Sequence, residues 1–191
     1  MSANYWVDPV VFLLDTLLGL YIFALLLRFL FQWVGADFYN PISQFLIKIT
    51  HPLLRPIRRI IPSIGRADSA SLVLMFGLQM LGGFLIFLFK GKTISLAALC
   101  VWTVSELIEL VFSFYFFAII IRVLLSWVGT GVYSPAVSLL YGLTEPLLRA
   151  SRRLLPPMGG IDLSPLIPLI AIQLGRMLVL PPLQQIEILI N

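Results

Sequence analysis

Four long apolar stretches constrain this chain more than any other feature of its sequence. They lie at residues 10–34, 70–89, 104–128 and 164–180, and the last stops at Pro181-Pro182. An α-helix needs about 20 mostly apolar residues to cross a bilayer. Residues 93–103 are apolar too, and one helix over 93–128 would be about 54 Å long, so we expect part of it to protrude, tilt or bend. We therefore predict an all-α membrane protein with four transmembrane helices.

The composition supports lipid as the main solvent of the chain. Of its 191 residues, 60% are hydrophobic and 12% are charged, whereas soluble domains are about 45–50% apolar and about 25% charged. This excludes a cytosolic enzyme and a disordered tail, because the surface of so small a soluble chain must be polar. The single cysteine, Cys100, excludes a disulfide-stapled secreted module and a cysteine-cluster metal site. Residues 1–8 hold no Lys or Arg, so we expect the first helix to stay attached rather than act as a secretory signal.

The positive charges gather on one predicted side of the membrane. Four crossings place segments 35–69 and 129–163 on the same side, where they hold eight of the 13 Lys and Arg, whereas the opposite side has Lys90 and Lys92. The positive-inside rule places these basic segments in the cytoplasm and both termini outside. Anionic lipid headgroups are the expected partner of such segments, and nucleic acid is not.

The sequence repeats itself without a gap at an offset of 94 residues. The offset pairs Arg28 with Arg122, Asp15 with Glu109, and residues 50–68 with residues 144–162. Because two helices separate equivalent points, both units have the same orientation. We expect a first unit at residues 1–92 and a second at 93–191, each a helix, an amphipathic segment and a helix. The four spans should pack as one bundle, which a homo-oligomer could extend.

Each unit has an amphipathic segment, at residues 40–66 and 134–160. Asn40-Pro41 and Ser134-Pro135 are typical helix starts. Apolar residues then recur at i, i+3, i+4 and i+7, which predicts a short helix lying in the membrane interface. We expect His51-Pro52 and Glu145-Pro146 to break or restart these helices.

Each amphipathic segment carries three arginines on one helix face. A guanidinium can hold a phosphate with two hydrogen bonds while its stem lies against acyl chains. The alternative is that these charges only orient the chain in the membrane. The candidate residues for docking an anionic lipid or another membrane protein are Arg55, Arg58, Arg59, Arg149, Arg152 and Arg153.

A glycine and an aspartate follow each group of arginines, at Gly65 and Asp68 and again at Gly159 and Asp162. We expect the glycine to close one helix and the aspartate to cap the next. An ion site that uses both aspartates is the alternative.

Charged residues inside membrane spans are costly and are functional hypotheses by default. Arg28 and Arg122 lie near one end of their helices, where their side chains could snorkel to water. We expect Arg176 to pair with Glu106 or Glu109, as a structural bridge or as part of a polar pathway. The candidate intramembrane polar residues are Asp15, Arg28, Glu106, Glu109, Arg122 and Arg176.

Catalytic signatures are absent from the sequence. His51 is the only histidine, so the two-histidine zinc motif is impossible, and no Gly-x-Ser-x-Gly occurs. We predict that the chain is not an enzyme, that it has no catalytic or metal-binding residues, and that it needs no cofactor.

The repeated pattern Arg-x-x-x-x-Trp, Tyr-x-Pro and Thr-x-Pro-Leu-Leu-Arg-x-x-Arg-Arg-x-x-Pro-x-x-Gly-x-x-Asp resembles that of the YggT family, also called YlmG. The resemblance covers residues 10–180, and Ala150, where the first unit has a proline, is a mild departure. It implies a multi-pass protein of the bacterial inner membrane, with relatives in chloroplasts. It also implies links to osmotic stress and potassium uptake, to cell division and nucleoid distribution, and to maturation of a membrane cytochrome.

Our functional hypothesis is a non-enzymatic scaffold or assembly factor for a membrane process under envelope or osmotic stress. Its basis is the pair of basic segments together with the lack of catalytic residues. One alternative is a channel or transporter subunit in potassium or osmotic homeostasis, in which the intramembrane polar residues and Gln173 would line a path. The other alternative is a cell-division or nucleoid-distribution factor.

Overall fold

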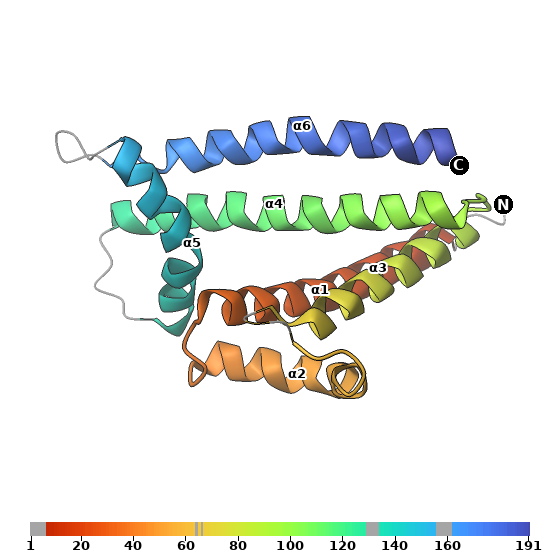
Figure 1. Ribbon diagram of the computed structural model, residues 1–191, viewed down its shortest axis with the longest axis horizontal. Helices are drawn as coiled ribbons and strands as arrows, with labels where there is room; N and C mark the ends of the chain where they lie inside the picture. Colours follow the sequence, from red (N-terminus) through yellow and green to blue (C-terminus); the bar gives the residue numbers. More distant parts are fainter. Residues whose placement is uncertain (1–6, 64, 66, 129–133, 156–161) are drawn as a thin grey trace.

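The computed structural model describes residues 7–63, 65, 67–128, 134–155 and 162–191. These residues form six α-helices and no β-strand (Figure 1). The helices are α1 (Val7–Val34), α2 (Pro41–Arg58), α3 (Ser69–Phe89), α4 (Leu96–Val128), α5 (Pro135–Leu154) and α6 (Leu166–Ile190). The predicted all-α class is therefore confirmed.

Four of the helices, α1, α3, α4 and α6, are long and apolar enough to cross a membrane. In Figure 1, α1 and α4 run in one direction and α3 and α6 in the other, so the amino end of α1 and the carboxyl end of α6 lie at the same end of the bundle. The helix α4 has no boundary at residue 104 but runs unbroken for 33 residues, about 50 Å. This exceeds the roughly 30 Å of a bilayer core, as the sequence led us to expect.

The last helix is longer than predicted. We expected it to stop before Pro181-Pro182, but α6 continues through both prolines to Ile190. A proline removes its own hydrogen bond and strains the preceding turn without having to end the helix. The far end of α6 is held to the start of α4, because the Ser95 amide donates to Asn191 Oδ1 at 2.9 Å and its hydroxyl donates to the Ile190 carbonyl at 2.9 Å.

The two amphipathic helices also continue where we expected a break. Pro52 and Pro56 lie inside α2, and Pro146 lies inside α5. The ribbons of both helices change direction along their length in Figure 1, so the prolines bend the helices rather than end them. The predicted start of α2 is confirmed, since Asn40 is its N-cap and accepts from the Ile42 amide at 2.9 Å. Ser134 is the N-cap of α5, but its side chain makes no cap hydrogen bond.

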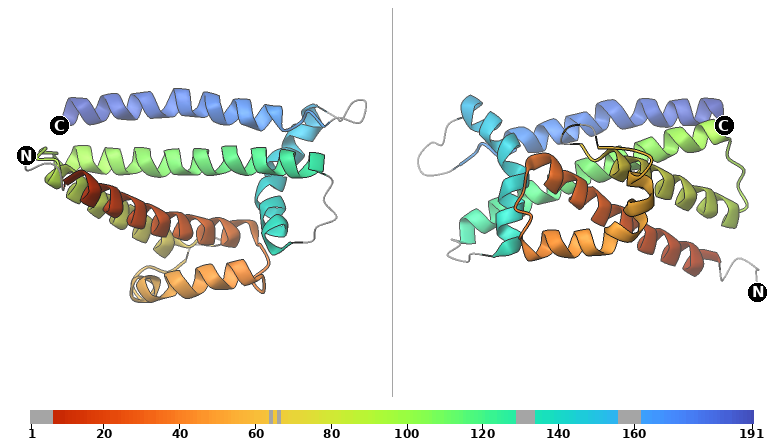
Figure 2. Two further views of the ribbon diagram at one scale, coloured as in Figure 1. Left: turned by 180° about the vertical axis from the view of Figure 1, so that it is seen from behind. Right: turned by 60° about the horizontal axis from the view of Figure 1, so that its bottom comes forward.

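The amphipathic helices pack differently from one another. Both views of Figure 2 show α5 lying across the end of the bundle at which α1 and α4 finish. In contrast, α2 folds back alongside α1, where the Tyr21 hydroxyl donates to the Ile49 carbonyl at 3.3 Å. Leu46 and Leu54 of α2 are buried in a core with residues of α1 and α3. The two amphipathic helices therefore do not lie against the bundle in the same way.

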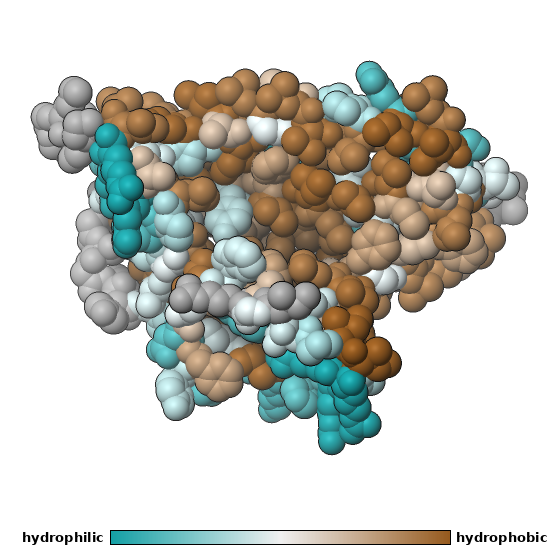
Figure 3. Space-filling model, in the orientation of Figure 1, coloured by the Kyte–Doolittle hydropathy of each residue, from teal (hydrophilic) through white to brown (hydrophobic). Residues whose placement is uncertain are grey.

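Apolar side chains cover the outside of the long helices. Figure 3 shows hydrophobic residues over much of their faces, with hydrophilic residues at the ends of α2 and α5 and over the carboxyl half of α6. Phe12, Leu17 and Leu178 are among many large apolar side chains that are exposed. Such a surface suits lipid, because water would penalise contiguous apolar area of this extent.

Gly83 allows α3 and α4 to pack closely against one another. A Cβ atom on Gly83 of α3 would lie 2.2 Å from Cζ3 of Trp102 on α4. No side chain fits at that distance, so glycine lets the indole ring lie against the backbone of α3, as small residues do at membrane helix interfaces.

Candidate functional site

A buried arginine fastens α2 to α1. The Arg28 side chain on α1 is only 7% exposed. Its Nη1 donates to Thr50 Oγ1 at 2.6 Å and to the Ile47 carbonyl at 3.3 Å, and the Thr50 hydroxyl in turn donates to the Leu46 carbonyl at 2.6 Å. A buried charge is tolerated only when such partners are present. We call this arrangement of a span arginine and an amphipathic-helix threonine an arginine clasp.

A second arginine clasp joins α5 to α4. Nη1 of Arg122 donates to Thr144 Oγ1 at 2.8 Å and to the Tyr141 carbonyl at 3.3 Å. Each of these groups lies 94 residues beyond its counterpart in the first clasp. Both arginines are buried, so our expectation that they snorkel to water is wrong. The reason is that the amphipathic helices supply hydrogen-bond acceptors for the guanidinium groups. The free energy of the buried side chain is therefore lower than that of a side chain extended to water. The recurrence of Thr50 as Thr144 was the sequence signal for these partners.

The two clasps differ in two partners. The Arg122 guanidinium lies over the Tyr141 ring, 4.3 Å from its centroid, where the first unit has Ile47. In the second clasp, Nη2 of Arg122 also donates to Glu145 Oε2 at 2.6 Å. This hydrogen bond is the main reason that the pKa of the Glu145 carboxyl lies below its ordinary value, and it outweighs the opposing effect of burial. Position 51, the counterpart of Glu145, is a histidine. The first clasp therefore lacks a carboxylate like the one that neutralises the Arg122 guanidinium in the second clasp.

An arginine and an aspartate close the loop after each amphipathic helix. Arg58 donates to the Asp68 carboxylate, and Arg152 Nε donates to Asp162 Oδ2 at 3.3 Å. Asp68 is almost fully buried and also accepts from the Ser71 hydroxyl at 2.6 Å. Burial alone would raise the pKa of the Asp68 carboxyl, but the hydrogen bonds from Arg58 and Ser71 outweigh it and lower the pKa. Desolvation likewise opposes the lowered pKa of Asp162, and hydrogen bonds from Ser164 and Arg152 prevail.

The expected capping roles of these residues are confirmed only in part. Asp68 is the N-cap of α3, as predicted, but its side chain makes no cap hydrogen bond. Arg58 and Ser71 both donate to its Oδ2, and its Oδ1 has no hydrogen-bond partner among the described residues. Asp162 precedes α6, whose N-cap is Pro165. Gly65 has a positive φ of 61°, but it lies in the loop and α2 has already ended at Arg58. Gly159 lies outside the described residues.

Each aspartate is paired with an arginine, and Oδ1 of Asp68 has no hydrogen-bond partner in the part of the chain that the structure describes. Among the described residues, no three His, Cys, Asp or Glu side chains lie close enough together to hold a metal ion.

The six candidate docking arginines separate into two groups. Arg58 and Arg152 are engaged by the aspartates. Arg149 lies 3.8 Å from Glu145 but remains 70% exposed. The exposed group, which keeps most of its charge open to solvent or headgroups, is Arg55, Arg59, Arg149 and Arg153.

A third charged cluster lies between α4 and α6. Arg176 Nη2 lies 2.6 Å from Glu109 Oε1, and the Ser113 hydroxyl donates to the same oxygen at 2.9 Å. Arg176 also donates to Ser113. The expected pairing of Arg176 is thus confirmed, with Glu109 as the partner. Asp15 and Glu106 are exposed and form no ion pair with any described residue.

Comparison with known proteins places the chain in one family. The CCB3/YggT family model matches residues 7–89 and again residues 101–183. An uncharacterized protein of Pseudomonas aeruginosa is 45% identical over 172 residues, covering 89% of this chain and 87% of its own length. The uncharacterized protein YggT of Escherichia coli K12 is 41% identical over 162 residues, covering 84% of this chain and 83% of its own length. No solved structure matches the chain. With both matched segments and these relatives spanning most of its length, the chain belongs to the CCB3/YggT family.

Proposed function

We propose that this protein is a non-enzymatic integral protein of the bacterial inner membrane that acts as a scaffold or assembly factor in an envelope or osmotic-stress-related process. The observation that carries the proposal is the pair of arginine clasps. They hold α2 and α5 against the spans through buried hydrogen bonds, while four other arginines of these segments stay exposed. The exposed arginines form two cationic groups, one at the carboxyl end of α2 and one at the carboxyl end of α5 (Figure 1).

We further propose that the chain is built of two repeats of the same orientation, at residues 1–92 and 93–191. Three observations support this architecture. The two family matches begin at residues 7 and 101, which differ by 94, and end at residues 89 and 183, which also differ by 94. The hydrogen bonds of both clasps recur at the same offset. The directions of the four long helices in Figure 1 repeat in the order α1, α3, α4, α6.

The proposed orientation places α2 and α5 in the cytoplasm and both termini outside, because basic segments are retained on the cytoplasmic side. There, each exposed arginine near an anionic surface contributes about 1 kcal/mol of attraction. Reporter fusions at the carboxyl terminus test the orientation, which fails if cytoplasmic fluorescence appears there without external phosphatase activity.

The scaffold proposal is tested by crosslinking and pull-down from native membranes. Replacing the exposed arginines with glutamine should abolish capture of specific partner proteins while insertion and orientation stay unchanged. The matched control replaces Lys90 and Lys92, which are exposed in the connection between α3 and α4 at the other end of the bundle. Equal capture by both variants and the unmodified protein would refute docking through the exposed arginines. The captured partners would also decide between stress adaptation and a cell-division or nucleoid-distribution role.

A channel or transporter subunit for potassium is the second candidate, and the cluster of Arg176, Glu109 and Ser113 favours it. Arg176 Nε is buried without a hydrogen-bond partner among the described residues, so the cluster is not fully satisfied by the protein. Purified protein in liposomes provides the test. Potassium flux that disappears in Glu109→Gln would overturn the scaffold proposal. If the flux does not exceed that of empty liposomes, the channel candidate is excluded.

A further inference from the structure

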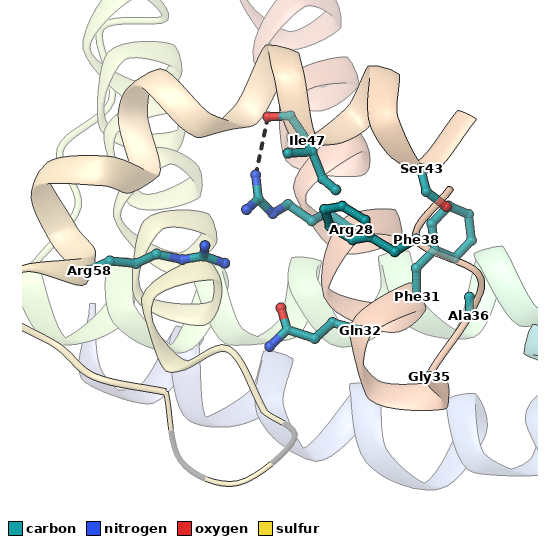
Figure 4. Close-up of a pocket in the computed structure, with 9 residues that line it drawn as sticks. All are labelled: Arg28, Phe31, Gln32, Gly35, Ala36, Phe38, Ser43, Ile47 and Arg58. Carbon is teal, nitrogen blue, oxygen red and sulfur yellow. Dashed lines mark hydrogen bonds between the residues drawn. The ribbon is translucent and has the colours of Figure 1, made fainter. Parts of the chain in front are cut away.

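A pocket of about 330 Å³ lies between the end of α1 and the first turns of α2. Arg28 and Arg58 both line it, and Figure 4 shows their guanidinium groups directed toward one another, with the Gln32 amide turned toward the space between them. Two cations that face each other repel, and an anion between them converts the repulsion into attraction. Asp68 binds Arg58 but does not line the pocket. The two arginines against one carboxylate leave a net charge of +1 there.

The second half of the protein shows what Arg28 lacks. Arg28 and Arg122 place Nη1 on equivalent threonine and carbonyl oxygens. Arg122 then uses Nη2 to bind Glu145, whereas both hydrogen bonds of Arg28 to α2 use Nη1. With His51 in place of Glu145, the remaining nitrogens of Arg28 make no hydrogen bond or ion pair with a carboxylate among the described residues, and the negative charge that acts on Arg28 from a distance, that of Asp68, is held by Arg58. An anion from outside the chain can occupy this position.

A buried hydroxyl in the same pocket also lacks a partner. Ser43 lines the pocket, is only 5% exposed, and its Oγ makes no hydrogen bond within the part of the chain that the structure describes. A buried polar group without a partner costs about 1–3 kcal/mol. Since a hydroxyl can donate to a ligand oxygen, Ser43, which lies beside Phe38 at the other end of the pocket from Arg58 (Figure 4), is a further sign that the pocket is shaped for a ligand.

The walls and position of the pocket favour a lipid as the source of that anion. Phe31 and Phe38 line it beside the guanidinium groups. Trp33 and Tyr39, close by in the chain, are exposed, and these residue types concentrate at the headgroup level of membranes. A phosphate with an acyl chain attached matches a pocket that has charge at one part and aromatic rings at another.

We propose that this pocket binds the phosphate of one anionic phospholipid between Arg28 and Arg58. The phosphate takes the place that the Glu145 carboxylate has in the second half, Gln32 donates to it, and the acyl chains lie along Phe31 and Phe38. The bound lipid completes the first clasp and holds α2 against α1. This inference rests on the proposed membrane placement of the bundle, but not on the identity of any partner protein.

The test is native mass spectrometry of the full-length protein in detergent micelles, titrated with phosphatidylglycerol or phosphatidylcholine. The key variant is His51→Glu, which supplies Arg28 with the carboxylate that Arg122 already has. Because a hydrogen bond between charged groups contributes about 1.5–3 kcal/mol, the first phosphatidylglycerol should bind at least about tenfold more weakly. A second variant, Gln32→Glu, adds the same charge from the exposed end of α1 and should also weaken binding. The matched control, Ser138→Glu on the exposed face of α5, should leave the affinity within about twofold.

One phosphatidylglycerol retained by the unmodified protein in preference to phosphatidylcholine, and lost in both pocket variants, supports the proposal. Equal retention of the two lipids overturns it, as does undiminished binding by both variants. Displacement of the lipid by millimolar inorganic phosphate would also overturn it, because the pocket would then recognise free phosphate. Loss of lipid binding with partner capture intact would leave the scaffold proposal standing, so the two failures are distinguishable.

Discussion

Replacing Thr50 with valine is the most direct test of the arginine clasp. The substitution keeps the shape of the side chain and removes the hydroxyl that accepts from Arg28 at 2.6 Å. Among the described residues, the one other acceptor for Arg28 is the Ile47 carbonyl at 3.3 Å. Because a hydrogen bond to a charged group contributes about 1.5–3 kcal/mol, we expect Thr50→Val to lower the free energy of unfolding by about 2 kcal/mol.

The second clasp provides an internal comparison. Thr144→Val removes a hydrogen bond of 2.8 Å, but Arg122 keeps Glu145 at 2.6 Å. Since the guanidinium retains a carboxylate, we expect a loss of about 1 kcal/mol. The two losses in the free energy of unfolding are compared with each other. Their difference measures how far the two clasps differ.

The assay is equilibrium unfolding of the purified, delipidated protein in mixed micelles, followed by circular dichroism. Thr93→Val, at an exposed position before α4, is the control and should change the stability by less than about 0.5 kcal/mol. Equal losses for Thr50→Val and Thr144→Val would show that Glu145 does not compensate. A loss for Thr50→Val no larger than that of the control would refute the clasp as a stabilising contact.

Three further predictions concern the packing and charge pairs. Gly83→Ala should destabilise the protein by about 1–3 kcal/mol, because the new methyl group would force Trp102 away from α3; thermal unfolding in micelles measures this. Asp68→Asn should lower stability above pH 3.8, the ordinary pKa of the group, and the difference from the unmodified protein should vanish as pH falls through the lowered pKa of the folded state; unfolding at several pH values measures this. Glu109→Gln should cost only about 0.5–1 kcal/mol in the same unfolding assay, since this carboxylate is 38% exposed.

Each of these predictions has a result that would contradict it. Gly19 has open space around its Cβ position, so Gly19→Ala is the control for Gly83→Ala, and equal effects of the two would refute the close approach of α3 and α4. A stability difference for Asp68→Asn that grows toward low pH would show that Asp68 is destabilising when charged. A loss above about 3 kcal/mol for Glu109→Gln would mean that this pair behaves as a fully buried bridge.

Much of the fold follows from patterns within single segments. The spans α1 and α3 were predicted within three residues of their observed starts, because length and hydropathy alone decide whether a segment can cross a bilayer. The start of α2 could also be predicted from the sequence, since Asn40 caps and Pro41 begins the helix within the same short segment. The ends of α2, α5 and α6 were not, because whether a proline breaks or bends a helix depends on what its neighbours contact.

The candidate site was only half accessible from sequence. The pairing of Arg176 could be expected because only two acidic residues lie at the right depth in α4. The partners of Arg28 and Arg58 could not, since Thr50 and Asp68 reach them only through the path of α2 back along α1. The charge pattern also could not separate the engaged Arg58 and Arg152 from the exposed arginines.

The sequence by itself determined the solvent of this protein, the number of its long apolar helices and the family to which it belongs. These properties are local sums over residues, or recurrences at the offset of 94, and need no knowledge of contacts. Only the tertiary structure decided that the arginines of α1 and α4 are buried, that Glu145 neutralises one of them, and that the other faces Arg58 across an open pocket. The physical reason is that the cost of a charge depends on the partners that distant segments bring to it. The two repeats share the buried arginine and its threonine, but the first has His51 where the second has Glu145.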